Sequence, residues 1–188
     1  GRWALQSAVT AENAHPFFDE QLQRMIVLNG QFNGEIETDV RNFLEKVAEF
    51  SFRSQNSSEY FALLWGYYFD RLSEEKRRFN SIRTQIEKGL ENYSIGSQSI
   101  DYQVFHKIKD KSSDKVDELA FIEAARHMTR GGGQIAVAGL SLHSPRRLLV
   151  ASHDRPVFIV RRVQTGEFMV VSDINAAMGL FSQKMIQR

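Results

Sequence analysis

The stretch that decides the fold is RMIVLNGQFN, residues 24–33. Its apolar run from Met25 to Leu28 contains β-branched residues and predicts a buried strand. The strand is expected to stop at Asn29-Gly30, where Gly30 can take a positive φ and lets a ligand approach the backbone. Two alternatives stay open at that point. One is an ordinary hairpin turn, which the dipeptide alone favours; the other is an oxyanion-binding corner made by the Asn29 amide and a backbone N–H.

Composition limits the classes of protein to consider. The 188 residues suffice for one domain with a hydrophobic core. A formal net charge of +1, from 24 basic and 23 acidic residues, gives no overall field that favours nucleic acid or an acidic membrane surface. Cysteine is absent, so these residues offer no disulfide, no Cys-ligated zinc and no thiol nucleophile. No apolar run approaches the roughly 20 residues that span a bilayer, and a cytoplasmic protein is expected.

The remaining pattern predicts helices paired with antiparallel strands, which is an α+β fold. Helical periodicity is present in four segments: 37–50, 57–69 with Ser57 as N-cap, 72–93, and 114–128 before three glycines. Strands with short returns follow at 134–142, 147–152, 156–160 and 168–171. The histidines at positions 106, 127, 143 and 153 lack the spacing of metal ligands, so no metal site is predicted.

Several short motifs stand at spacings known from one enzyme family. Arg2-Trp3-Ala4 is followed by Asn13-Ala14-His15-Pro16, then by the apolar strand and Asn29-Gly30. Near the other end, an apolar strand runs into Ser172-Asp173. Together these motifs resemble the glutaminase domain of class II glutamine amidotransferases, and most of all the glucosamine-6-phosphate synthase branch. The resemblance implies a short helix at 175–185 after the Ser172-Asp173 strand. It covers both ends of the chain, and residues 72–113 are interpreted as a helical insertion outside it.

The resemblance implies a fold and a set of roles. The fold would be a four-layer αββα sandwich of the N-terminal-nucleophile type, with residues 1–188 as one glutaminase-like domain that is incomplete at both ends. Arg2 would bind the α-carboxylate of glutamine, and Trp3 would cover the bound amino acid. Asn29 and Gly30 would stabilise the oxyanion. His15 stands among the substrate-binding positions, although a histidine before proline is by itself more often a packed structural side chain.

One position departs from the family pattern. The turn before residue 60 usually carries an aspartate that binds the α-ammonium group of glutamine, and the aligned residue here is Ser57. A serine has no charge to pair with an ammonium group. Asn56 and Glu59 are the neighbours that the sequence offers as replacements. Leu5 and Gln6 also replace a Thr-His pair of the family.

Two functions are therefore expected from the sequence. The first is hydrolysis of L-glutamine to supply ammonia to a synthase or sugar-isomerase domain or subunit, without a cofactor and with the nucleophilic cysteine outside this chain. The alternative is a non-catalytic glutaminase-like domain with a regulatory or assembly role, and an unrelated α+β binding domain stays open beside it. No nucleic-acid or membrane partner is expected, and the resemblance leaves a homodimer open.

Overall fold

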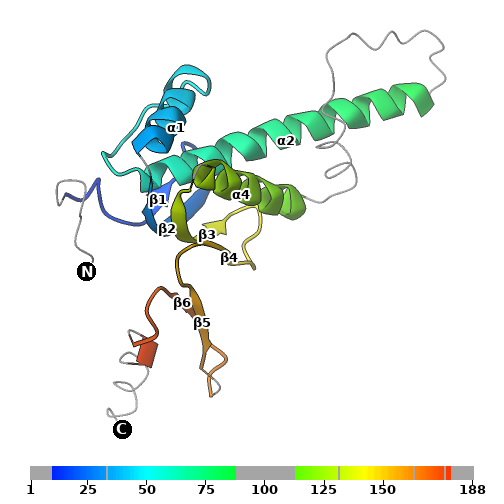
Figure 1. The fold of residues 1–188 in the computed structure, drawn as a ribbon. Coiled ribbons are helices and arrows are strands. Elements are labelled where there is room, and N and C mark those ends of the chain that lie inside the picture. Colours follow the sequence, from blue (N-terminus) through cyan, green and yellow to red (C-terminus); the bar gives the residue numbers. More distant parts are fainter. Residues whose placement is uncertain are drawn as a thin grey trace.

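The computed structural model describes residues 10–32, 34–87, 113–130, 132–162, 164–175 and 177–178. Within these residues the fold is α+β, as the sequence predicts, with a four-stranded antiparallel sheet of order β1-β2-β3-β4 and a separate two-stranded sheet, β5-β6 (Figure 1). The elements are β1 (Phe17–Phe18), β2 (Arg24–Gln31), α1 (Gly34–Lys46), α2 (Ser58–Glu87), α4 (Ser113–Thr129), β3 (Gln134–Ser141), β4 (Leu149–His153), β5 (Phe158–Arg161) and β6 (Phe168–Val171).

The strand β2 does not stop at Asn29-Gly30. It continues to Gln31 and pairs with β3 along its whole length, with Asn29 opposite Ala136 and Gly30 opposite Ile135. The predicted strand end and the hairpin-turn alternative are therefore both wrong. The local Asn-Gly signal is overridden by pairing with a strand about a hundred residues later in the chain.

Gly30 is required for space and not for a positive φ. A Cβ atom at this position would lie 2.8 Å from the Gln134 carbonyl oxygen and 2.8 Å from Leu28 Cδ2. Real Cβ atoms do not approach backbone oxygen so closely. The glycine thus allows β2 and β3 to pair at the point where the resemblance sets its oxyanion corner.

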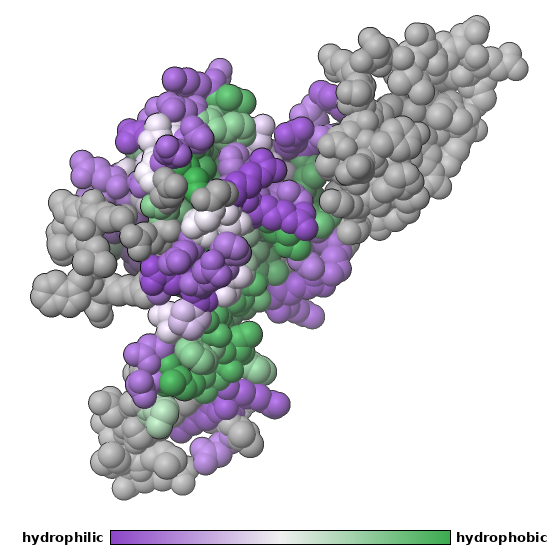
Figure 2. All heavy atoms as spheres, in the orientation of Figure 1, coloured by the Kyte–Doolittle hydropathy of each residue, from purple (hydrophilic) through white to green (hydrophobic). Residues whose placement is uncertain are grey.

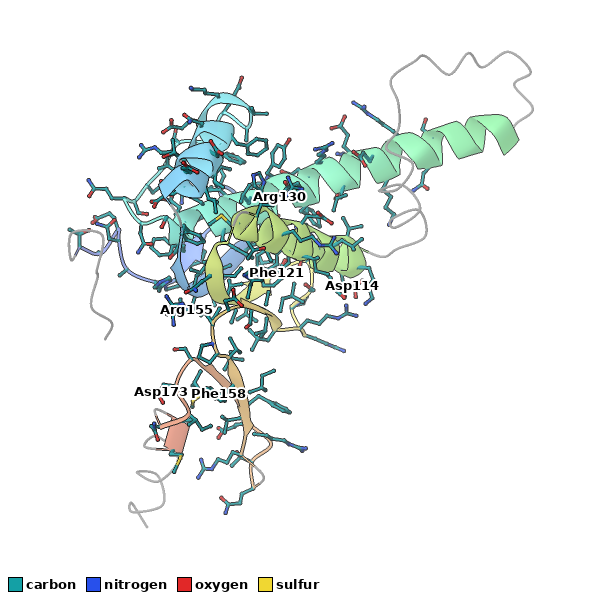
Figure 3. All side chains as sticks on the ribbon, viewed as in Figure 1. Asp114, Phe121, Arg130, Arg155, Phe158 and Asp173 are labelled. Atoms are coloured by element: carbon teal, nitrogen blue, oxygen red, sulfur yellow. The ribbon has the colours of Figure 1, made fainter. Side chains whose placement is uncertain are left out.

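One face of the four-stranded sheet is covered by α2 and α4, which lie side by side across it (Figure 1). Ile135 and Val137 of β3 are buried against these helices, and Ala136 and Ala138, on the other face of the strand, are buried as well. Gly139 lies in the same row as Ile135 and Val137, and a Cβ there would be 2.7 Å from the Trp65 ring. Phe121 lies on α4 (Figure 3), and Trp65 packs edge to face with its ring at 4.9 Å between ring centroids. This aromatic pair fills the centre of the core.

The helices differ from the sequence prediction mainly at their ends. The first predicted helix corresponds to α1, with Val40 and Leu44 buried, but it ends at Lys46 and leaves Val47 exposed. The helix α2 is continuous over 30 residues and includes both the apolar run and the charged segment after Leu72. The predicted helix 114–128 corresponds to α4, which begins one residue earlier. No described helix is both long and apolar enough to cross a membrane.

The other face of the four-stranded sheet and the β5-β6 hairpin carry apolar side chains on the surface. Val27 of β2 and Leu140 of β3 are exposed on the face away from the helices. The hairpin extends away from the rest of the fold, and hydrophobic residues gather over it (Figure 2). The expected antiparallel order holds for β3-β4 and for β5-β6, but β4 does not pair with β5. Of the helix expected at 175–185, residues 176 and 179–185 lie outside the described residues.

A buried ionic network connects the sheet to the helices. Arg24 at the start of β2 is 1% exposed; its Nη1 donates to Asp19 Oδ2 at 2.7 Å and its Nε donates to Asp117 Oδ1 at 3.0 Å. Asp117 of α4 also accepts from Ser144 Oγ at 2.7 Å, and its carbonyl accepts from Trp65 Nε1 at 3.0 Å. The sequence analysis did not predict this network, because charged residues are usually exposed.

Candidate functional site

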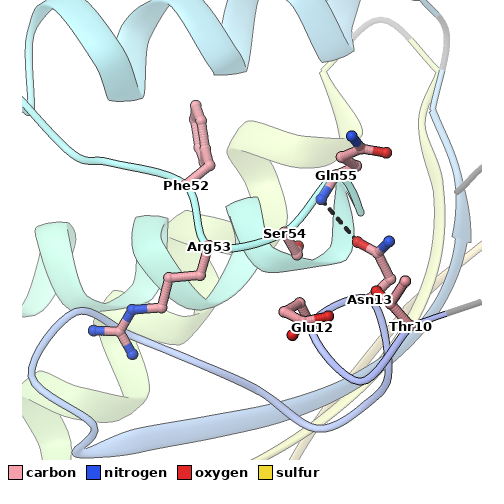
Figure 4. A pocket seen from close by; sticks show the side chains of 7 residues that line it. All are labelled: Thr10, Glu12, Asn13, Phe52, Arg53, Ser54 and Gln55. Atoms are coloured by element: carbon pink, nitrogen blue, oxygen red, sulfur yellow. Dashed lines mark hydrogen bonds between the residues drawn. The ribbon is translucent and has the colours of Figure 1, made fainter. Parts of the chain in front are cut away.

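Two loops that are distant in the sequence are hydrogen-bonded together next to the N-terminus of α2. The first loop, residues 10–16, contains the Asn-Ala-His-Pro motif, and the second, residues 52–57, precedes α2. Asn13 is buried, and its Oδ1 accepts the Gln55 backbone N–H at 2.9 Å (Figure 4). Its carbonyl oxygen accepts from Asn56 Nδ2 at 3.3 Å. These two bonds fix the loops relative to one another.

The second loop is held by the first turn of α2. Glu59 is 3% exposed, and its carboxylate accepts the backbone N–H groups of Arg53 and Ser54, both at 2.9 Å. The same carboxylate accepts from Ser54 Oγ at 2.8 Å. A buried carboxylate with three donors is a structural group, since its charge is used to order the backbone. Glu59 lies in the first turn of α2.

Ser57 stands immediately before α2, as the sequence predicts for an N-cap residue. At the start of α2 it is the side chain of the preceding residue that accepts a backbone N–H: Asn56 Oδ1 accepts from Ser58 N at 2.9 Å. Ser57 itself is buried. Both polar groups of the Asn56 amide are thus engaged, one with Ser58 and one with Asn13.

An open hollow of about 330 Å³ lies between the two loops (Figure 4). This volume is at the lower end of the range for small-molecule sites, roughly 300–1,000 Å³. Seven residues from both loops line it, six of them polar or charged by type: Thr10, Glu12, Asn13, Phe52, Arg53, Ser54 and Gln55. Asn13 belongs to a motif recognised in the sequence, but its bonding role was not predicted from the sequence, nor were Glu12, Arg53 and Gln55 singled out.

Asn29 and Gly30 lie where one edge of β2 has no described strand beside it. The strand β1 pairs with β2 only at Met25 and Ile26, whereas β3 occupies the opposite edge throughout. Successive backbone N–H groups in a strand point to opposite edges. One N–H of the Asn29-Gly30 pair is therefore directed to β3 and the other to the edge without a described strand.

The loop that contains His15 runs toward this same end of β2. Phe17 is paired with Ile26 in antiparallel register, so residues before Phe17 extend in the direction of Asn29. The His15 ring packs edge to face against Phe17, with 4.8 Å between centroids. This contact fits a packed histidine. The structure thus joins the His15 and Ser57 loops and directs the first toward Asn29-Gly30, while Arg2 and Trp3 lie outside the described residues.

His127 and His143 are each hydrogen-bonded to a side chain from another part of the chain. His127 Nδ1 is hydrogen-bonded to the Tyr68 hydroxyl at 2.8 Å, and burial lowers the pKa of His127, with a smaller effect from Arg130. His143 Nε2 donates to Gln23 Oε1 at 2.8 Å, and burial followed by Arg24 lowers the pKa of His143. The described part of the chain contains no group of three or more side chains able to hold a metal ion.

Neither the models of known protein families nor the curated proteins include a match to this sequence.

Proposed function

We propose that this chain is the glutamine-binding part of a glutaminase domain that supplies ammonia to a synthase, as in the glucosamine-6-phosphate synthase branch of the class II amidotransferases. The observation that carries the proposal is the pair of hydrogen bonds made by Asn13. They unite the Asn-Ala-His-Pro segment with the turn before α2, two parts of the family pattern that are about forty residues apart in the chain.

The pairing of β2 supports the second half of the proposal. A backbone N–H of the Asn29-Gly30 pair that points away from β3 is a donor of the kind that stabilises a tetrahedral oxyanion. One such donor contributes on the order of 3 kcal/mol to transition-state stabilisation. In this proposal Arg2 binds the α-carboxylate and Trp3 covers the ligand, and the nucleophile comes from a residue outside these 188, which contain no cysteine.

The apolar open face of the four-stranded sheet supports the finer fold. Val27 and Leu140 expose 49% and 40% of their surface on the side away from the helices. A sheet with one face on helices and an apolar second face is half of an αββα sandwich. In the proposed fold a second sheet, which includes the β5-β6 hairpin, packs on that face.

A second candidate is a non-catalytic relative with a regulatory or assembly role. Ser57 favours this candidate, because it stands at the aligned aspartate position, is buried and carries no charge. The ligand pocket would then lack the family's partner for an ammonium group.

A covalent probe separates the two candidates. The intact mass of the full-length natural polypeptide is measured before and after exposure to a diazoketone analogue of glutamine. We expect one stoichiometric adduct, because the analogue alkylates a nucleophile only when the pocket binds it. The Arg2→Ala variant, as a matched control, is expected to form the adduct much more slowly. A protein with an N-terminal cysteine that forms no adduct would contradict glutamine binding and support the non-catalytic candidate.

A further inference from the structure

An amino-acid ligand needs a negative charge near its ammonium group, and the structure narrows the choice of residue. Ser57 has no charge. Asn56 engages its amide with Ser58 and Asn13, and Glu59 engages its carboxylate with Arg53 and Ser54. Redirecting either side chain to a ligand would leave partly buried backbone donors without these partners, which is costly. Asn56 and Glu59, the two neighbours that could replace the aspartate, are thus both occupied by hydrogen bonds within the protein.

Glu12 is the carboxylate that remains among the residues lining the hollow. It stands beside Asn13, whose hydrogen bonds fix the first loop against the second. The Glu12 side chain is exposed, and in Figure 4 it lies on the loop below Ser54 and Gln55. Hydrogen bonds from its own backbone and from Thr10 lower the pKa of Glu12, so the carboxylate is charged at neutral pH.

Arg53 of the opposite loop also lines the hollow, but its guanidinium group points away from Glu12 (Figure 4). The side chain is exposed, and its Nη2 donates to the Glu20 carbonyl oxygen at 3.3 Å. Glu12 is therefore the charged group that faces a ligand in the hollow, and a carboxylate suits a ligand that carries an ammonium group. An α-amino acid is such a ligand.

We propose that Glu12 is the residue that binds the ammonium group of an α-amino-acid ligand in the hollow between the two loops. The inference rests on the proposed function for the identity of the amino acid, glutamine or its product glutamate. Glu12 supplies the negative charge that Ser57 lacks, and the amino group of the ligand lies beside Asn13.

The test is calorimetric titration of the full-length protein with L-glutamate. Glu12→Gln removes the charge and keeps the size of the side chain. We expect this variant to bind L-glutamate about tenfold more weakly, as is typical when a charge-assisted hydrogen bond is lost. Glu12→Asp keeps the charge and is expected to retain most of the affinity. Glu49→Gln removes an exposed carboxylate that does not line the hollow, and it is expected to bind like the unmodified protein.

Glutarate, which has the same two carboxylates but no amino group, identifies the group that Glu12 contacts. The unmodified protein is expected to prefer L-glutamate over glutarate, and Glu12→Gln is expected to lose that preference. If Glu12→Gln binds L-glutamate with unchanged affinity while Arg2→Ala does not bind it, the role of Glu12 is overturned and the proposed function stands. If the unmodified protein does not bind L-glutamate, both proposals are overturned.

Discussion

Gly30 shows how a single residue can be fixed by its neighbours in space. Its backbone conformation is that of an ordinary strand residue, because β2 passes straight through it. The constraint comes from the Gln134 carbonyl oxygen and the Leu28 side chain, each 2.8 Å from the position of a Cβ. A side chain here would push β2 away from β3 at the proposed oxyanion donors.

We predict that Gly30→Ala destabilises the fold by about 1–3 kcal/mol, the usual cost of forcing extra atoms into a packed site. Urea unfolding followed by circular dichroism measures this change. Gly34→Ala is the matched control, because a Cβ at Gly34 meets no atom within 4 Å. Equal midpoints for the two variants would show that β2 and β3 are not as closely packed as described.

The sequence predicted the strand around residue 26 correctly but not its end. An apolar run with β-branched residues is a local property, so it can be recognised without knowledge of the partner strand. The end of β2 is set by pairing with residues 134–136, which no local signal contains. The same reason explains Asn13: its motif was recognised, but its hydrogen bond to Gln55 depends on a loop far away in the sequence.

Among the elements, α4 has an end that responds to pH. His127, near its C-terminus, packs 5.2 Å from the Phe43 ring of α1 and is hydrogen-bonded to Tyr68 of α2. Burial and Arg130 lower the pKa of His127 below its ordinary value of 6.5. The unfolded chain therefore binds a proton at a higher pH than the folded protein does.

The lowered pKa of His127 predicts how the stability of the fold changes with pH. The stabilising contribution of neutral His127 is complete above pH 6.5 and is lost as the pH falls through the lower pKa of the folded state. We expect Tm to decrease between about pH 7 and pH 5, and His127→Gln, which does not titrate, to flatten that decrease. His143 has a pKa lowered in the same direction, so the double variant with His143→Gln should be the flattest. An unchanged slope in His127→Gln would refute the assignment.

Elements with a strong period and clear ends were predicted best. The helix α4 has apolar positions at helical spacing and glycines after it, and the prediction differs from the structure by one residue at its start. The length of α2 was harder to predict, because a buried apolar segment and a charged segment have different compositions although they form one helix. The direction in which the β5-β6 hairpin extends from the fold is set by tertiary contacts, and no local sequence pattern indicates it.

At the scale of the whole molecule, the Arg24 network connects four parts of the chain. It joins the turn before β2, the start of β2, the first half of α4 and the turn after β3 through Asp19, Arg24, Asp117 and Ser144. The guanidinium group also lies 4.0 Å from the Phe69 ring centroid of α2. The helix layer and the sheet are thus locked together by charges that are almost completely buried.

We predict that Asp117→Asn lowers the free energy of unfolding by about 1–3 kcal/mol, because an amide cannot accept from both Arg24 Nε and Ser144 Oγ as the carboxylate does, whereas Arg24 keeps its ion pair with Asp19. The control is Glu118→Gln, the next residue, whose partially exposed ion pairs with Lys115 and Arg147 are worth about 1 kcal/mol or less. Chemical denaturation of both variants provides the comparison. A loss at Asp117 no larger than that at Glu118 would show that the network does not hold the layers together.

The long-range pairing of β2 with β3 also determines when the sheet can form. Among the residues that the structure describes, β2 has the two-residue strand β1 as its sole strand neighbour until residues 134–141 exist. Closing a loop of roughly a hundred residues costs chain entropy before the first backbone hydrogen bond between β2 and β3 can form. Contacts between residues so far apart in the sequence slow folding. On the ribosome, β2 must therefore remain without its main partner until β3 has left the exit tunnel. During that interval its apolar surface is a target for chaperones or for the same strand of another nascent chain.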